Sequence, residues 1–349
     1  MHLDRLDLPG LDLDRLGLAW LDPADPERHG IDGAVAVLEA ARALDCPHEI
    51  PSIPDAYRAY LRHGWDGEPP EAAVLCDPTG RVVAVLEVSL PRRDNTHLAY
   101  VEITVDPVLR RRGIGRLLFD QAVHRVCAEG RELLVAESFD EAPGGAFCTA
   151  LGLECASTDV KRRQDFRCLD WSALDALHAA AEGAASGYEL VRMPREIPDE
   201  LMPAVVTMVS AINDAPLDDL QLEDEVFTPE RIRAFHLAQV ARGRRIYQLA
   251  ARHRASGALA GHTVVAVEGY LPAYAHQFDT SVLAEHRGHR LGVLLKAAML
   301  RWLAEAEPQL RVIDTWNAAS NSHMVTVNEA LGYQVVATST AYQRHLAQK

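Results

Sequence analysis

The alternation of apolar and polar positions repeats along the chain at an offset of 177 residues. Residues 80–90 (GRVVAVLEVSL) and 257–267 (GALAGHTVVAV) each begin with a glycine turn and continue as a β-branched strand. Residues 100–105 (YVEITV) and 277–282 (QFDTSV) follow at the same offset, and both alternate with a period of two. Because several segments match in register, the pattern predicts an internal duplication.

Each alternating strand leads through a glycine-containing loop, RRRGIG (110–115) or RGHRLG (287–292), into a segment with helical apolar spacing. A strand (132–136 or 311–315), a helix and an LG pair (151–152 or 331–332) that ends this helix follow in both copies. The faces expected to be buried contain Val101, Ile103, Val105, Ile114, Leu117, Leu118, Ala122 and Val126 in the first copy, and Phe278, Thr280, Val282, Leu291, Leu294, Leu295, Ala298 and Trp302 in the second.

This order of elements predicts an α/β fold in which helices flank a mixed sheet. A chain of 349 residues is too long for one ordinary core, so two domains of similar size are expected. The alanine-rich segment 172–187 reads as a helix or linker between them. We therefore expect domains at residues 1–179 and 180–349.

Composition narrows the classes of function. A net charge of −15 argues against a nucleic-acid partner and suits a cationic amine as substrate. No apolar run approaches the roughly 20 residues of a membrane helix, and residues 1–10 carry acids rather than an export signal, so a cytoplasmic protein without membrane contact is expected. The six cysteines form no CxxC pair, and no metal site is expected.

The two loops are candidate anion sites. A helix that starts directly after a glycine-containing loop presents unpaired backbone N–H groups, and arginines add positive charge there. The alternative is an ordinary turn with a solvated charge cluster. Neither loop has the glycine-lysine ending of a Walker A loop or the three-glycine spacing of a dinucleotide site.

The order strand, V-x4-R-x-x-G-x-G, helix, strand, Asn-containing helix, LG[FY] resembles the GNAT superfamily of acetyl-CoA-dependent N-acetyltransferases. The resemblance covers both copies and implies two tandem GNAT domains, with a loop that caps the coenzyme A pyrophosphate, a preceding strand that binds pantetheine and a late Asn that contacts the cofactor. The cofactor residues that it implies are Val282, Leu283, Ala284, Arg287, Gly288, His289, Arg290, Leu291, Gly292, Asn317 and Asn321, and in the first copy Val105, Arg110, Arg112, Gly113, Ile114 and Gly115. Arg290 departs from the motif, which has glycine there, so it either offers a guanidinium to a phosphate or strains the loop.

For catalysis, the resemblance implies a base on the strand before the loop and an acid on the late helix. The base candidates are His276 and Asp279, which are otherwise polar strand residues, and Glu102 matches Asp279 in the first copy. The family's late Asn corresponds to Asn321, while its usual acidic Tyr is replaced by Asn328. The first copy has Glu141 and Cys148 at these two positions, and Tyr333 or His323 are possible substitute acids in the second.

The acceptor is expected to bind an acidic segment, residues 202–225, through Asn213, Asp214, Glu223 and Glu225, unless this is only a solvated loop. These features predict a monomeric or homodimeric enzyme in which an amine of a small molecule attacks acetyl-CoA directly in a ternary complex. The second copy is expected to be catalytic and the first degenerate. A non-catalytic acyl-CoA sensor or scaffold and a protein-lysine acetyltransferase remain as alternatives.

Overall fold

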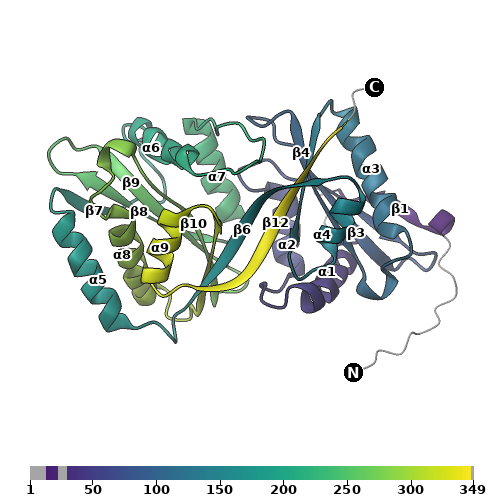
Figure 1. Cartoon of the computed structure of the whole chain (residues 1–349), viewed down its shortest axis with the longest axis horizontal. Helices are drawn as coiled ribbons and strands as arrows, with labels where there is room; N and C mark the ends of the chain where they lie inside the picture. The colour runs from purple at the N-terminus through teal and green to yellow at the C-terminus, as the bar shows by residue number, and fades with distance from the viewer. Residues whose placement is uncertain (1–12, 23–29, 347–349) are drawn as a thin grey trace.

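The computed structural model describes residues 13–22 and 30–346. Residues 1–10, for which the sequence predicts no export signal, lie outside this part. Within it the strands form one twelve-stranded sheet with helices on both faces, and the molecule is elongated across the strands (Figure 1). The strand order is β1-β2-β3-β4-β5-β12-β6-β11-β10-β9-β8-β7. This mixed α/β architecture confirms the predicted fold class.

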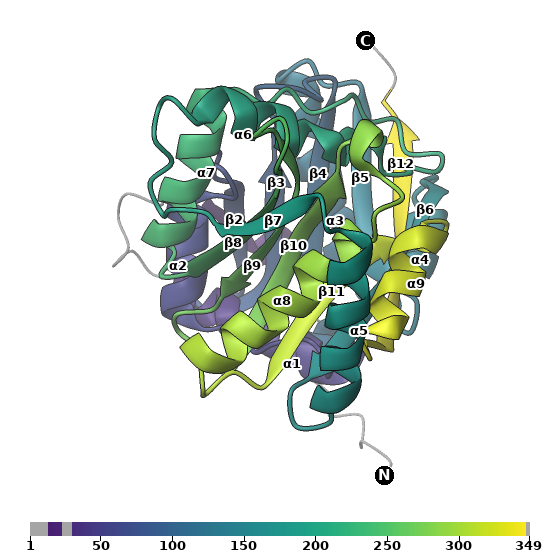
Figure 2. The same cartoon turned by 90° about the vertical axis from the view of Figure 1, so that its left-hand side faces the viewer.

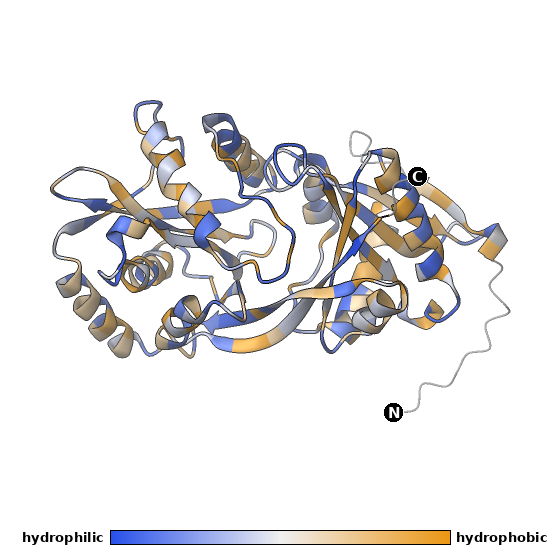
Figure 3. Cartoon of the chain, turned by 45° about the horizontal axis from the view of Figure 1, so that its top comes forward, coloured by the Kyte–Doolittle hydropathy of each residue, from blue (hydrophilic) through white to orange (hydrophobic). Residues whose placement is uncertain are grey.

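The N-terminal half holds the elements up to β6. In chain order they are η1 (Leu13–Arg15), β1 (Gly17–Trp20), α1 (Ile31–Asp45), α2 (Pro54–His63), β2 (Glu71–Cys76), β3 (Val82–Ser89), β4 (Leu98–Val105), η2 (Pro107–Leu109), α3 (Ile114–Ala128), β5 (Leu133–Phe139), α4 (Gly144–Ala150) and β6 (Glu154–Asp165). Apolar residues dominate its central strands (Figure 3), and seven of the eight residues of β3 are buried.

The C-terminal half repeats this order. After the connecting helix α5 (Trp171–Ala184) its elements are β7 (Tyr188–Arg192), α6 (Met202–Val209), η3 (Ser210–Asp214), α7 (Pro229–Ala241), β8 (Arg245–His253), β9 (Leu259–Val267), β10 (Tyr274–Val282), η4 (Ala284–His286), α8 (Leu291–Ala306), β11 (Val312–Ala318), α9 (Ser322–Ala330) and β12 (Gln334–His345). Helices α5 and α8 cover one face of this half, and α6 and α7 cover the other (Figure 2). The proposed division at residue 180 falls inside α5.

The two halves exchange their last strands. β12 pairs with β5 of the N-terminal half, and β6 pairs with β11 of the C-terminal half, while β6 and β12 pair with each other in the middle of the molecule (Figure 1). Each half of the sheet is therefore completed by a strand that belongs, in sequence, to the other half. Nothing in the 177-residue repeat distinguishes this exchange from two separate sheets.

In each half, two neighbouring parallel strands pair only over a short stretch and then separate. β4 and β5 pair only between Leu98↔Leu133 and Tyr100↔Val135, and β10 and β11 only between Tyr274↔Val312 and His276↔Asp314. Beyond these pairs the strands diverge toward the loops that precede α3 and α8. Backbone groups that face this opening lack a ladder partner, so each half offers an extended ligand a place to bind along one strand edge.

Most predicted core positions are confirmed. The apolar faces of β4 and α3 pack in the core of the N-terminal half, and that of α8 packs in the core of the C-terminal half. The LG pairs end α4 and α9, where Gly152 and Gly332 adopt φ of 77° and 81°.

One predicted face is wrong. β10 contains a β-bulge, because its register against β9 shifts between Gln277 and Thr280, whereas β4 pairs with β3 without a shift. Phe278 consequently packs toward Phe235 of α7, while Val282 packs against the core under α8. The extra residue of the bulge interrupts the period of two on which the prediction depended.

Candidate functional site

The two loops have the same backbone built from different residues. In the first loop Arg111 and Gly113 adopt positive φ (63° and 89°), and in the second Gly288 and Arg290 do so (82° and 56°). Arginine and glycine have thus changed places at two equivalent left-handed positions. Arg290 does not break the loop, but a non-glycine residue there carries a conformational cost of about 1 kcal/mol.

In the N-terminal half, apolar side chains approach the loop and the first turn of α3. A Cβ atom added to Gly113 would lie 3.1 Å from Cδ1 of Leu13, and one added to Gly115 would lie 3.1 Å from the ring of Phe147. Ile114 is buried beneath them. These apolar side chains crowd the side of each glycine on which a Cβ would lie, although Gly113 itself is exposed.

In the C-terminal half the same positions are open. No atom lies within 4 Å of a Cβ built on Gly288 or Gly292. The intervening His289 is exposed, with its ring centroid 5.3 Å from that of Tyr188, and Leu291 is buried. Space is thus open beside the glycine of the first turn of α8, where the unpaired backbone N–H groups of a helix start can attract an anion.

The arginine that begins each loop is held by a carboxylate. Arg110 forms a two-pronged ion pair with Asp45 (2.8 and 2.5 Å), and Arg287 pairs with Asp214. In both cases Nε also donates to the carbonyl oxygen five residues earlier, at 3.3 and 3.0 Å. The first pair is largely buried and the second is half exposed, so only the second guanidinium is readily available to a ligand.

Asparagine side chains border the opening between β10 and β11. Asn328 of α9 is fully buried and donates from Nδ2 to Oδ1 of Asn317 at 2.7 Å. Asn321 caps α9, because its Oδ1 accepts from the Met324 N–H at 3.2 Å. Asn321 thus has a structural task that the sequence resemblance did not anticipate.

The backbone at the strand ends is already paired. The Leu283 N–H donates to Ala260 at 2.9 Å, and the Asp106 N–H donates to Val83 at 3.0 Å. Free amides on β10 are therefore to be sought at the bulge, where the ladder is interrupted, rather than at the end of the strand.

The two base candidates differ in their partners. His276 contacts Glu268 at 3.2 Å, and Arg244 forms a second ion pair with that carboxylate. Burial tends to raise the pKa of Glu268, but His276 and Arg244 outweigh it and hold the pKa at about 2. Asp279 forms no hydrogen bond or ion pair within the described residues, and burial raises its pKa to about 6. A carboxylate without a partner, with a pKa near neutrality, suits proton abstraction better than a paired imidazole.

The N-terminal half has carboxylates in the corresponding place. Burial, helped by the charge of Glu87, raises the pKa of Glu102 to about 7, and burial, helped by Glu102, raises that of Glu137 to about 7. Both side chains still touch solvent. Burial also raises the pKa of Glu87, which accepts a 2.7 Å hydrogen bond from Tyr57.

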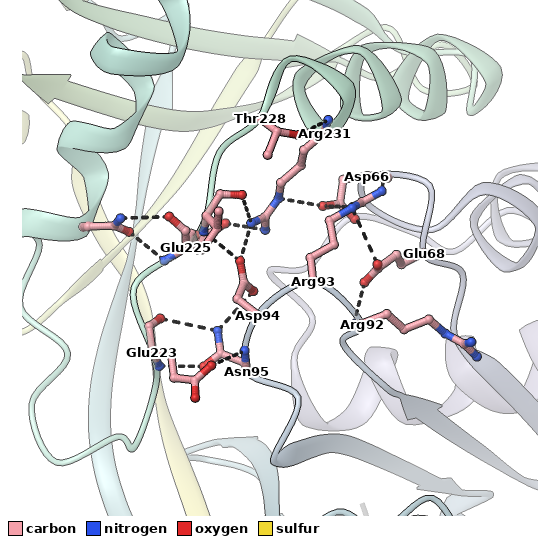
Figure 4. Close-up of polar contacts among 12 residues, drawn as sticks. Asp66, Glu68, Arg92, Arg93, Asp94, Asn95, Glu223, Glu225, Thr228 and Arg231 are labelled. Carbon is pink, nitrogen blue, oxygen red and sulfur yellow. Dashed lines mark hydrogen bonds and ion pairs between the residues drawn. The ribbon is translucent and has the colours of Figure 1, made fainter.

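An ion-pair network joins the halves near the acidic segment (Figure 4). Arg231 of α7 contacts Asp94, Asp66 at 3.1 Å and Glu225 at 2.6 Å. Glu223 binds the backbone and side chain of Asn95 through hydrogen bonds of 2.9 and 2.7 Å. The acidic residues here are therefore shared between salt bridges and the interface rather than simply solvated.

Beside this network lies a cavity of about 430 Å³ that both halves line. Of the predicted acceptor residues, Asn213, Glu223 and Glu225 line it, whereas Asp214 does not. The Asn213 side chain also holds the backbone of Glu225. Its Nδ2 donates to the Glu225 carbonyl oxygen and its Oδ1 accepts from the Glu225 N–H, both at 3.0 Å.

The cavity is adjacent to the base candidate of the C-terminal half. Trp65 lines the cavity, and its ring centroid lies 4.6 Å from that of Phe278 at the bulge. Burial raises the pKa of Glu225 against the opposing effect of Arg231, and the nearby charge of Asp279 raises it further. Trp65 was missed by sequence analysis because it comes from the other half.

The part of the chain that the structure describes, residues 13–22 and 30–346, lacks two kinds of feature. No helix there combines the length and apolarity needed to cross a bilayer, and no His, Cys, Asp and Glu side chains there group as metal ligands.

Comparison with known proteins identifies the fold. Residues 38–142 match the model of the Acetyltransferase (GNAT) family. A tandem GNAT protein from the clavulanic acid biosynthesis pathway is 30% identical, with 95% of this chain and 98% of that chain covered and a TM-score of 0.78. No curated protein sequence matches significantly.

Two more distant structures share the fold alone. A GCN5-related N-acetyltransferase from Sphaerobacter thermophilus is 14% identical, with 95% of this chain and 96% of that chain covered and a TM-score of 0.69. Saccharomyces cerevisiae N-myristoyltransferase is 12% identical, with 97% and 81% covered and a TM-score of 0.58. The identity and coverage of the clavulanic acid pathway protein show that this chain belongs to the GNAT family of acetyltransferases, as a tandem two-domain member.

Proposed function

We propose that the C-terminal half transfers an acetyl group from acetyl-CoA to a primary amine of a small cationic molecule by direct attack in a ternary complex. The observation that carries this proposal is the β-bulge of β10, which places the unpaired Asp279 beside the cavity shared by the halves. The N-terminal half has no bulge at this place and is proposed to act structurally.

The residues of the C-terminal loop fit a diphosphate. The open space at Gly288 and Gly292 lets an anion approach the first amides of α8, and the exposed Arg287, His289 and Arg290 surround it. The Val282–Ala284 segment and Asn317 border the path from the loop to the bulge. Bound there, acetyl-CoA would supply the activated thioester.

The chain's own groups would then act on the acceptor. Asp279 in its ionised form accepts a proton from the attacking amine, and free amides at the bulge stabilise negative charge that develops on oxygen. Glu223 and Glu225 attract an ammonium group into the cavity, and Trp65, which packs against Phe278, gives that cavity an aromatic wall. A cavity of about 430 Å³ suits a small molecule better than an extended protein segment.

The alternative of a non-catalytic acyl-CoA sensor is motivated by Asn328, which stands where the family's usual acid is expected. Its buried amide cannot protonate a leaving group. Release of thiol from acetyl-CoA in the presence of a panel of diamines and cationic amines distinguishes the enzyme from the sensor.

The location of the cofactor is tested by calorimetry with coenzyme A. Gly292→Glu places a negative charge at the open helix start and is expected to weaken binding at least tenfold, while Gly292→Ala, which adds only a methyl group to open space, stays within threefold. Arg112→Glu makes a comparable charge change in the other loop and is expected to leave affinity unchanged. The reverse ranking would move the site to the N-terminal half, and no binding by the folded wild type would end the proposal.

A further inference from the structure

The core of the C-terminal half contains three buried polar side chains with unused hydrogen-bonding atoms. Lys296 of α8, Asn328 of α9 and Tyr333 just after α9 are 1%, 0% and 3% exposed. Lys296 Nζ, Asn328 Oδ1 and the Tyr333 hydroxyl have no hydrogen-bond partner in the described residues. We call these residues the buried triad.

The N-terminal half provides an internal comparison. Lys296 is equivalent to Phe119 at the 177-residue offset, and alignment of the two LG pairs makes Asn328 and Tyr333 equivalent to Cys148 and Leu153. All three of these residues pack in the apolar core of the N-terminal half. The fold therefore does not require polar side chains at these positions. Leaving several polar atoms unsatisfied in a core is costly, so their presence in only one half points to a function.

The triad reaches the opening between β10 and β11 through Asn328. Asn328 donates to Asn317, which lies three residues beyond the last parallel pair of these strands. The Tyr333 N–H donates to the Asn328 carbonyl oxygen at 3.0 Å, and Lys296 Nζ lies 4.7 Å from the centroid of the Tyr333 ring. The ring face thus supports a positive charge on Lys296 without occupying its three N–H groups.

We propose that the buried triad binds the sulfur end of coenzyme A and that Lys296 gives its proton to the departing thiolate. This inference rests on the proposed function. A thiolate in a buried site is stabilised by a cation and a hydroxyl donor, and Lys296 and Tyr333 provide these two groups. Asn328 holds the side of the opening in place through its hydrogen bond to Asn317. The other described lysine, Lys161, lies beside β11, but its ammonium is paired with Glu49 and Asp314.

The proposed step balances. The amine nitrogen bonds to the carbonyl carbon and the carbon–sulfur bond breaks, so the electron pair of that bond remains on sulfur. Sulfur takes a proton from the Lys296 ammonium, while Asp279 takes one from the amine, and solvent returns both groups to their starting states. Burial lowers the pKa of Lys296 to about 7, which makes its ammonium a better proton donor than an ordinary lysine.

The test uses Lys296→Met, which replaces the amine by an apolar side chain of similar length. We expect the wild type to bind coenzyme A at least fivefold more tightly than desulfo-coenzyme A, and the variant to bind both equally. With acetyl-CoA, kcat should fall at least a hundredfold while KM stays within threefold. The melting temperature should stay the same or rise, because an unpaired buried amine is removed.

Tyr333→Phe, which deletes one hydroxyl, is the milder variant and should lower the preference for coenzyme A over desulfo-coenzyme A about twofold to threefold. A folded Lys296→Met protein that keeps this preference and its kcat would overturn the inference while leaving the proposed function intact. If Lys296→Met fails to fold, the Tyr333→Phe variant is the deciding test. A Tyr333→Phe protein with an unchanged preference for coenzyme A over desulfo-coenzyme A would then contradict the role of the triad. A wild type that binds no coenzyme A contradicts both proposals.

Discussion

The two halves share a topology but differ at each point where a cofactor and an acceptor would meet. In the N-terminal half Leu13 and Phe147 pack beside the loop glycines, and the first arginine is buried against Asp45. In the C-terminal half the glycines are open and the first arginine is half exposed. The halves thus differ in the side chains that pack beside the loop glycines and in the exposure of the first arginine.

The difference extends into the strands and the core. β10 has a bulge and β4 does not, while Lys296 and Tyr333 replace apolar residues of the N-terminal half. After duplication, one copy can lose a ligand site and still retain its packing, because the apolar core alone sustains the fold. Because β6 of the N-terminal half pairs with β11 of the C-terminal half, the N-terminal half completes the sheet of the C-terminal half, and β12 does the reverse.

The largest expected effect is on catalysis, and it distinguishes Asp279 of the C-terminal half from Glu102 of the N-terminal half. Asp279→Asn should lower kcat/KM for acetyl transfer by about a hundredfold or more, because it removes the proposed proton acceptor at the bulge. In the wild type, activity should fall as pH drops through about 6, since the raised pKa means that Asp279 becomes protonated there.

Glu102→Gln is the matched change in the N-terminal half, and activity should stay within threefold. If Glu102→Gln costs as much as Asp279→Asn, measured by steady-state kinetics across pH, the assignment of chemistry to the C-terminal half is wrong.

A smaller effect is expected on stability when the first arginine of each loop, Arg110 or Arg287, is replaced. Arg110→Gln leaves the largely buried Asp45 without its partner and should lower the free energy of unfolding by about 1–3 kcal/mol. Arg287→Gln breaks a half-exposed pair and should cost under about 0.5 kcal/mol. Urea denaturation checks both, and equal losses would show that the two loops are braced alike.

The smallest effect concerns the exchanged arginine and glycine. Arg290→Gly relieves a left-handed arginine and should raise the free energy of unfolding by up to about 1 kcal/mol, while removal of the guanidinium should weaken coenzyme A binding a few-fold. Arg111→Gly is the counterpart in the other loop, with a similar gain in stability and no effect on affinity. Thermal unfolding and calorimetry measure the two quantities, and a loss of stability in Arg290→Gly would contradict the strain.

The sequence by itself determined the duplication, the strand–loop–helix order and most of the buried faces of β4, α3 and α8. These features follow from local periodicity and glycine placement, which act within one element and its turn. The same reasoning located both loops, because each follows a periodic strand at a fixed distance. Asp279 came instead from the resemblance to the GNAT family, which implies a base on that strand, and its role stays a prediction.

The tertiary structure alone decided the strand exchange, the bulge at Phe278 and the packing of Trp65 against it. It also decided that Asp214 braces Arg287 and that Lys296 has no partner. A strand's neighbour, a one-residue register shift and a missing hydrogen bond depend on contacts between residues far apart in the chain, and the local pattern of one sequence does not encode them.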